Sequence, residues 1–216
     1  GATSPDIRAI THDKREKYHF ADLNFVDVGS GLKNLFATHP ELLNTSTLDG
    51  PTTAFVAGYI SHLVLDESWT SKMYRPWFGN NTVFKDPTYG RVMDRAMQIE
   101  LDRRSRGNMQ YILPILAQTL GDVNIHFISN VDLKIWHRWV LHLVKKEFSW
   151  DRLNFMAKRI AAGDETHPSY SIAREFLKDF PNSLEQLYKT VPSKHLSNFR
   201  EESVTQINEV IMEYLT

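Results

Sequence analysis

The chain has 216 residues, 42% of them hydrophobic, which is enough for one substantial core or two small ones. Its 25 basic and 26 acidic residues give a net charge of −1, so charge makes nucleic-acid binding an unlikely role and predicts no attraction to anionic membranes. The absence of cysteine excludes disulfides, thiolate metal sites and cysteine nucleophiles. Any metal must therefore be held by His, Asp and Glu.

No apolar run is long enough to predict a transmembrane segment, and no signal peptide is visible. The missing signal favours a cytoplasmic location. The chain opens abruptly at Gly1-Ala2-Thr3-Ser4, close to the candidate ligand Asp6. We therefore expect that a natural N-terminal segment is missing from this sequence, and we leave the localisation open.

Helical periodicity and capping signals recur along the chain, whereas alternating strand patterns are nearly absent. The first long helix is expected within 21–43, with a break near Gly29-Ser30-Gly31, and the second at 51–74, after the start signal Asp49-Gly50-Pro51. Further helices are expected at 89–106, 108–120, 130–146, 149–162, 170–179, 183–190 and 193–215, with a turn-rich aromatic loop at 75–81 and one candidate for a short strand at 124–128.

No linker, repeat or low-complexity tract divides these elements. We expect an all-α, single-domain, multi-helix bundle over residues 1–216. Residues 1–147 would form a helical core with a metal site, and residues 148–216 a C-terminal helical extension without obvious chemistry.

The chemistry is concentrated first in the apolar helix expected at 51–74. His62 and Asp66 stand four residues apart, so they project from one face of this helix, one turn apart. Most of the remaining circumference is apolar, which is typical of a helix buried nearly all round. A buried imidazole and carboxylate need a partner, which is either each other or a metal ion.

A second pair of candidate ligands lies near the start of the chain, at Asp6 and His19. Pro5 makes the Asp6 region a loop or the beginning of a helix, and His19 precedes Phe20, so both side chains can face a core. Asp6, His19, His62 and Asp66 together make a two-His, two-carboxylate set that would be neutral with a divalent ion. Such a set suits zinc with room for a water, which the ion would make acidic.

These residues resemble a known family. Ser4-Pro5-Asp6-Ile7, His19 next to Phe20, and the helix segment from Gly58 to Asp66 are similar to motifs of the zinc-dependent phospholipase C family and its relatives, the P1 nucleases, over roughly residues 2–106. The resemblance implies an all-α fold and phosphoester hydrolysis at a three-zinc site. By position, Asp6, His19, His62 and Asp66 match the ligands of the first zinc, and Asp66 also matches the bridge to a second metal.

The sequence departs from this family at the other zinc positions. No His follows Asp66 in the segment 67–74, and the later His-x-x-x-Glu pair has as its counterpart Ala96 and Glu100, which keeps only the carboxylate. The third zinc uses an N-terminal amine and an early His in a region that this chain lacks. We therefore expect a divergent member with one zinc site, which other divalent metals could also occupy.

Two functions follow from this site. The first is a metal-dependent phosphoester hydrolase that acts on a small-molecule phosphoester or a lipid head group, with Asp6 or Asp66 accepting the proton of the attacking water. The second is a non-catalytic helical protein in which a structural or vestigial metal, or a hydrogen-bonded quartet, ties the N-terminal segment to the buried helix. The sequence gives no indication of an oligomeric state.

Other polar groups have simpler interpretations. The doublet His12-Asp13 is similar to that of HD-domain phosphohydrolases, but it lies in a charged stretch typical of a solvated loop. Arg103, Arg104 and Arg106 could neutralise a phosphate, although a solvated helix end is the default. The remaining histidines of the central region, His126, His137 and His142, are left outside the expected site.

Overall fold

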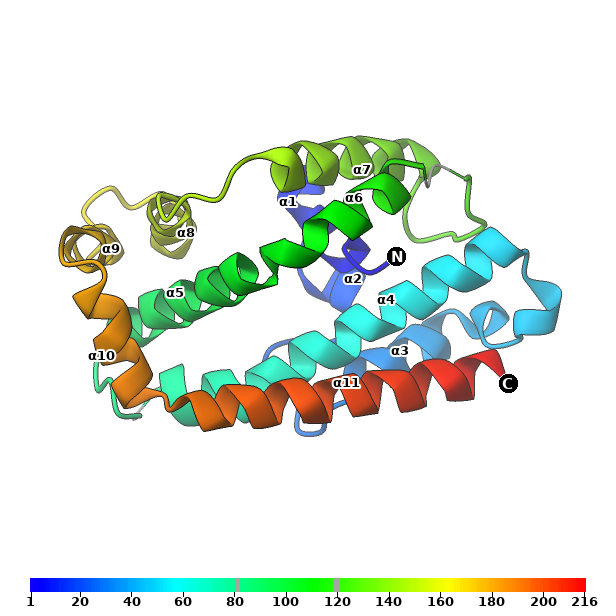
Figure 1. Ribbon diagram of the computed structural model, residues 1–216. Coiled ribbons are helices and arrows are strands. Elements are labelled where there is room, and N and C mark those ends of the chain that lie inside the picture. Colours follow the sequence, from blue (N-terminus) through cyan, green and yellow to red (C-terminus); the bar gives the residue numbers. More distant parts are fainter. Residues whose placement is uncertain (81, 119–120) are drawn as a thin grey trace. The chain divides into compact units, whose positions relative to one another are not determined.

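The computed structural model describes residues 1–80, 82–118 and 121–216. Within these residues every regular element is a helix and no strand is present, which confirms the predicted all-α fold (Figure 1). None of the described helices combines the length and the apolar character that a membrane crossing requires.

The helices form two compact units. Unit 1 consists of Gly1–Thr70, Tyr111–Lys146 and Arg200–Thr216, and unit 2 of Ser71–Gln110 and Glu147–Phe199. The expected extension at 148–216 is thus divided between the units. Most of it lies in unit 2 together with residues 71–110, whereas residues 200–216, which include most of its final helix, belong to unit 1.

Unit 1 contains the central helix α4 (Gly50–Trp69). Its other elements are η1 (Ser4–Ile7), α1 (Arg8–Thr11), α2 (Glu16–His19), α3 (Ser30–Thr38), η2 (Pro40–Leu42), η3 (Thr45–Thr47), α7 (Asn130–Lys145), and most of α6 (Met109–Gln118) and α11 (Ser193–Leu215). The short η1 packs against α2, α4 and α7. The beginning of the chain therefore lies against α2, α4 and α7.

The central helix α4 begins where the sequence predicts. The Asp49 side chain accepts a hydrogen bond of 2.7 Å from the backbone N–H of Thr52, and Pro51 occupies the first turn. Its buried side chains form the largest part of the core of unit 1: Val56, Ala57, Tyr59, Ile60, Leu63 and Val64. Leu65, however, is 43% exposed, so the helix is open on one side and is not buried all round.

The expected helix at 21–43 was predicted too long. Only Ser30–Thr38 (α3) and the turn of Pro40–Leu42 (η2) are helical. The predicted break is the true beginning, because Gly29 adopts a left-handed backbone with φ 102° before the first turn of α3. Residues 21–28 form turns instead, including one in which the N–H of Asn24 donates to the Asp22 side chain.

The prediction of a short strand at 124–128 was also wrong. Its backbone bonds go to side chains rather than to a neighbouring strand. The N–H of Asn124 donates to the Thr52 hydroxyl on α4 at 2.8 Å, and the preceding Val123 is held by the side chain of Asn130. These partners satisfy both backbone groups of Val123 and the N–H of Asn124 without a ladder.

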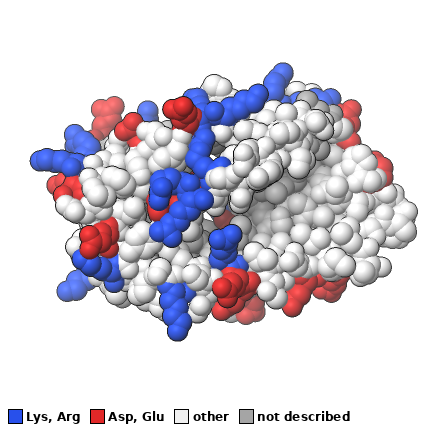
Figure 2. All heavy atoms as spheres, in the orientation of Figure 1, with Lys and Arg blue, Asp and Glu red and all other residues white. Residues whose placement is uncertain are grey.

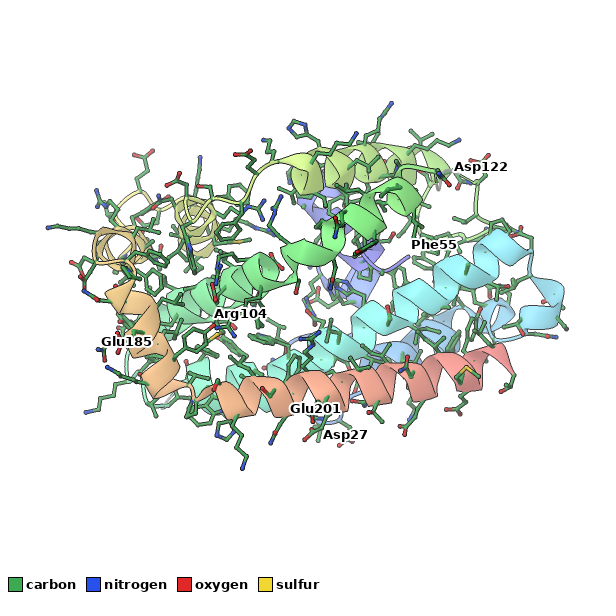
Figure 3. All side chains as sticks on the ribbon, viewed as in Figure 1. Asp27, Phe55, Arg104, Asp122, Glu185 and Glu201 are labelled. Carbon is green, nitrogen blue, oxygen red and sulfur yellow. The ribbon has the colours of Figure 1, made fainter. Side chains whose placement is uncertain are left out.

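One apolar helix of unit 1 lies on the surface. The sequence predicts a helix at 108–120; the structure has α6 at Met109–Gln118, which includes Pro114, and residues 119–120 lie outside the described residues. No side chain of α6 is buried, and Tyr111 and Ile115 are 69% and 68% exposed. Figure 2 shows almost no charged side chains over this helix and over the half of α4 that carries Phe55, which Figure 3 labels.

Unit 2 contains α5 (Pro87–Ser105), η5 (Arg106–Asn108), α8 (Arg152–Ala161), α9 (Ser169–Lys178) and α10 (Asn182–Thr190). Helix α5 packs against α8 and α9, and α9 against α10. The buried core includes Val92, Ala96 and Met97 of α5 with Leu153 and Ala157 of α8. These helices match the predicted ranges to within a few residues.

The prediction of a loop at 75–81 was mostly wrong. Residue 81 lies outside the described residues, and residues 75–78 belong to a π-helix, Thr70–Phe78. The wide turn is visible in the bond that the Gly79 N–H donates to the Tyr74 carbonyl, five residues earlier, at 2.7 Å. This widening lets the chain remain helical around Pro76, which has no N–H to donate.

Candidate metal site

Two short elements and the long helix α4, all in unit 1, position the candidate ligands. Pro5 begins the 3-10 turn η1, in which Ile7 is fully buried and anchors the turn beside Asp6. His19 is the last residue of α2, and Phe20 ends that helix with a left-handed φ of 55°. His62 lies in the middle of α4.

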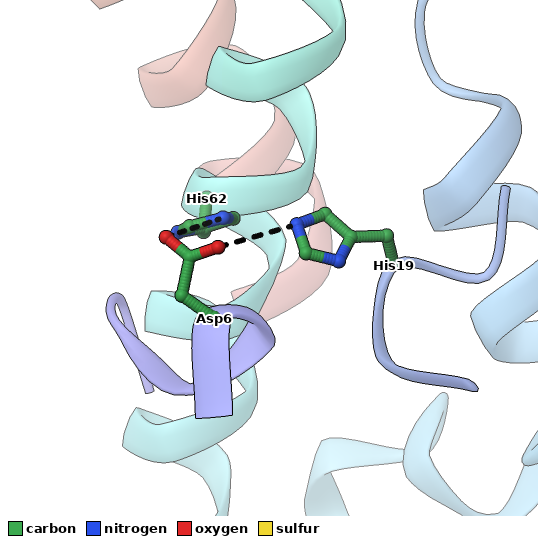
Figure 4. Close-up of side chains that lie close together, drawn as sticks. All are labelled: Asp6, His19 and His62. Atoms are coloured by element: carbon green, nitrogen blue, oxygen red, sulfur yellow. Dashed lines mark ion pairs between the residues drawn. The ribbon is translucent and has the colours of Figure 1, made fainter. Parts of the chain in front are cut away.

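The structure brings Asp6, His19 and His62 together (Figure 4). One possible ligand atom from each residue lies within 4.8 Å of the other two. The Asp6 carboxylate lies between the rings, with Oδ1 at 3.9 Å from Nε2 of His19 and Oδ2 at 4.0 Å from Nε2 of His62. The two imidazole rings meet edge to face, with 5.4 Å between their centroids. All these separations are too long for direct hydrogen bonds and leave space between the three groups.

The hydrogen bonding of His62 fixes which ring nitrogen carries its proton. Nδ1 lies 2.9 Å from the backbone carbonyl of Ala2. Because a carbonyl only accepts, a neutral His62 must donate from Nδ1, and its Nε2 then carries the lone pair. That Nε2 is buried, faces Asp6, and has no hydrogen-bond partner within the described residues. A carbonyl that orients a histidine in this way is the usual outer partner of a metal-binding imidazole.

His19 also offers an unprotonated ring. It is 2% exposed, and burial, followed by the charges of Arg15 and His62, lowers its pKa to about 2. Neither of its ring nitrogens has a hydrogen-bond partner within the part of the chain that is described. His19 and His62 therefore place buried ring nitrogens that have no hydrogen-bond partner among the described residues beside the Asp6 carboxylate.

This donor set fits a divalent metal ion. Two imidazoles and one carboxylate form a known three-ligand set for zinc, and the same atoms suit other divalent transition metals. A cation among them would satisfy the buried nitrogens, which otherwise remain costly unpaired groups. The Asp6 side chain is 61% exposed, so the group is open to solvent on one side. An open position is typical of catalytic rather than structural zinc sites.

The fourth predicted ligand, Asp66, has another partner in this structure. Its Oδ2 is ion-paired with Nη2 of Arg15, with side-chain exposures of 30% and 16% respectively. Asp66 does not belong to the group of three. It does not hydrogen-bond to His62 either, since the partner of His62 is the Ala2 carbonyl. The ion pair involves only Oδ2, and ligation by Asp66 stays a prediction.

Sequence reasoning missed Arg15, which lies in the charged stretch 13–17. Arg15 and His19 are four residues apart around α2, and the His19 N–H donates to the Arg15 carbonyl at 2.9 Å. The same spacing separates His62 and Asp66 on α4. The two pairs face each other, His19 with His62 and Arg15 with Asp66. The sequence does contain the spacing of four residues in both pairs. It does not show that the two helices lie against each other, which only the folded chain reveals.

Sequence reasoning also missed Glu67 of α4, which holds the beginning of α3 next to the site. This carboxylate is 3% exposed and accepts bonds from the N–H groups of Gly29, at 2.5 Å, and Gly31, at 2.6 Å, at the beginning of α3. Burial raises the pKa of Glu67, while these bonds oppose the change. Gly31 also lies so close to the His19 carbonyl that a Cβ there would be 2.5 Å away. Glu67 and Gly31 thus fix α3 and the end of α2 against α4.

The other candidates lie away from this group. His12, His126 and His142 are exposed, and Nε2 of His137 lies 2.7 Å from the Leu116 carbonyl. Asp13 is bound by Lys17 and Tyr18, which is the local arrangement expected of a solvated loop.

In unit 2, Glu100 is 1% exposed and accepts hydrogen bonds from Arg103 and Arg104. Figure 3 labels Arg104 on α5. Both guanidinium groups are thus held by the Glu100 carboxylate. Burial tends to raise the pKa of Glu100, but the bonds from both arginines prevail and lower it.

Comparisons of the chain with protein families, with curated proteins and with solved structures found no match. The resemblance to zinc-dependent phospholipases C therefore rests on the motifs of the sequence.

Proposed function

We propose that this protein is a metal-dependent phosphoester hydrolase, with Asp6, His19 and His62 as the protein ligands of one zinc or another divalent ion. One observation carries the proposal: the Asp6 carboxylate converges with two imidazoles whose buried Nε2 atoms have no hydrogen-bond partner among the described residues. A cation is the simplest ligand for such a group.

A divalent ion held there would polarise a phosphate oxygen and lower the pKa of a water molecule. The protein's own part is to keep His19 neutral through burial and to orient the ring of His62 through the hydrogen bond of its Nδ1 to the Ala2 carbonyl. Of the two carboxylates expected to accept a proton from water, Asp66 is held by Arg15. In this proposal the exposed Asp6 carboxylate takes that role.

The expected substrates are small phosphoesters, including lipid head groups. Long nucleic acids are disfavoured because the net charge of −1 provides no field to attract a polyanion. The exposed position of Asp6 supports access for a small molecule from solvent.

The alternative is a structural or vestigial metal that ties the N-terminal segment to α4. Direct contacts already make that connection: Ala2 binds His62, and Nε1 of Trp136 donates to the Thr3 hydroxyl at 3.2 Å. Because the segment is attached without an ion, and because one side of the group is open, we favour the catalytic function.

The test is hydrolysis of a panel of phosphomonoesters, phosphodiesters and phospholipids by the full chain, with and without added zinc. We expect weak, zinc-stimulated hydrolysis that is lost in His62→Asn and retained in His126→Asn, which changes an exposed histidine. A zinc-loaded protein that is inert toward the whole panel would favour the structural alternative.

A further inference from the structure

The ion pair between Arg15 and Asp66 lies next to the metal ligands. Arg15 stands one helical turn before His19, and Asp66 stands one turn after His62. Side chains at this spacing are about 5–6 Å apart at their Cβ atoms. The ion pair of Arg15 with Asp66 therefore lies one helical turn along from the pair of rings, His19 and His62.

Arg15 has hydrogen-bonding capacity left after it binds Asp66. A guanidinium group has five N–H donors, and Nη2 is the atom that contacts Asp66. The Nε of Arg15 is buried and has no hydrogen-bond partner among the described residues. A buried donor without an acceptor is costly, so this N–H points to an acceptor that the chain itself does not supply.

The charge around the ligands also suits an anion. Arg15 contributes a positive charge next to the group, where it is ion-paired with Asp66. With a divalent ion, the charges of the ion and Arg15 would outnumber those of the carboxylates of Asp6 and Asp66. The site would then be positive and would attract a phosphate group.

We infer that Arg15 is an anion-binding residue, which donates to an oxygen of a phosphate group whose other oxygen contacts the metal ion. Asp66 is then the positioning residue that holds the guanidinium in place. This inference rests on the proposed function, because it assumes an ion at Asp6, His19 and His62. The partially buried ion pair of Arg15 and Asp66 would then serve in substrate recognition.

The test uses inorganic phosphate as the probe and calorimetry as the readout. The unmodified chain, Arg15→Gln, Arg15→Lys and Arg138→Gln are each titrated with zinc and then, when loaded, with phosphate. Arg138 is an exposed arginine of α7 and serves as the matched control. We expect Arg15→Gln to keep zinc affinity within about twofold and to weaken phosphate binding about tenfold or more, because a charge-assisted hydrogen bond is lost.

Arg15→Lys should weaken phosphate binding less, since it keeps the charge but loses the planar fork. Phosphate binding by Arg15→Gln that equals that of the unmodified chain would overturn the inference and leave the metal site standing. Tighter zinc binding by Arg15→Gln with unchanged phosphate binding would also overturn it, and would show that Arg15 competes with the metal for Asp66. If the unmodified chain binds no zinc, the proposed function fails together with the inference. If Arg15→Gln misfolds and no longer binds zinc, the phosphate affinity of Arg15→Lys is compared with that of the unmodified chain instead, and equal affinities would overturn the inference.

Discussion

The Nδ1 atom of His62 lies 2.9 Å from the carbonyl oxygen of Ala2, and this contact turns the other ring nitrogen toward Asp6. It joins the first residues of the chain to the middle of α4. The contact also determines the tautomer, so His62 presents a lone pair to the place where His19 and Asp6 converge. The proposed metal site depends on this relationship more than on any other.

His62→Asn tests that relationship. The shorter amide can still donate to the Ala2 carbonyl, but it has no atom in the place of Nε2. We expect zinc affinity to fall by about 100-fold or more, because loss of a ligand exceeds the 10- to 100-fold cost of losing an outer partner. Calorimetric titration measures the change, and His126→Asn should leave the affinity unaltered. Equal zinc affinity in His62→Asn and the unmodified chain would remove His62 from the site.

Asp66→Asn separates the two roles considered for Asp66. Hydrolysis should fall in either case. In our proposal Asp66 only holds Arg15, so zinc affinity should change by less than about threefold, well under the cost of losing a metal partner. Weakening of zinc binding by more than about tenfold would instead establish Asp66 as a fourth ligand. Competition with a chromogenic chelator gives the affinity independently of turnover.

Gly31→Ala tests the packing behind His19. A Cβ at Gly31 would lie 2.5 Å from the His19 carbonyl and 2.8 Å from Oε1 of Glu67, so the backbone must shift. We expect a loss of about 1–3 kcal/mol in the free energy of unfolding, together with weaker zinc binding. Gly50→Ala is the control, because a Cβ there meets nothing within 4 Å. Denaturant titration of both variants checks the result, and equal stability of the two would contradict the described packing.

The pH dependence of unfolding tests the ion pairs of Glu100. The pKa of Glu100 is lowered from 4.5 in the folded protein, so its contribution to stability is present above 4.5 and is lost as the pH falls below that value. At pH 7 we expect Glu100→Gln to be less stable by about 1–3 kcal/mol. The difference should shrink as the pH falls below 4.5, as followed by thermal unfolding. Glu209→Gln, at an exposed position, should show no such trend.

The parts of the fold that local signals determine could be predicted from the sequence. The start of α4 follows from Asp49 and Pro51, the start of α7 from the capping Ser129, and the bounds of α11 match the predicted 193–215. The helix at 21–43 could not be predicted correctly, since the beginning of α3 is set by the carboxylate of Glu67, which is 36 residues from Gly31. Local periodicity contains no information about such a partner.

The candidate site divides in the same way. The spacing of His62 and Asp66 places them on one helix face, and the motif around Asp6 and His19 adds the other two residues. The partner of Asp66 was not predicted, because Arg15 is 51 residues away and lies in a run of charges that is typical of a solvated loop. Only the packing of α2 against α4 pairs His19 with His62 and Arg15 with Asp66.

Anomalous diffraction at the zinc edge, from crystals of the full chain grown with zinc, tests the central claim most directly. We predict one strong peak at about 2.0–2.2 Å from Nε2 of His19, Nε2 of His62 and a carboxylate oxygen of Asp6. No peak among these three residues, in crystals that contain zinc, would contradict the proposed metal site.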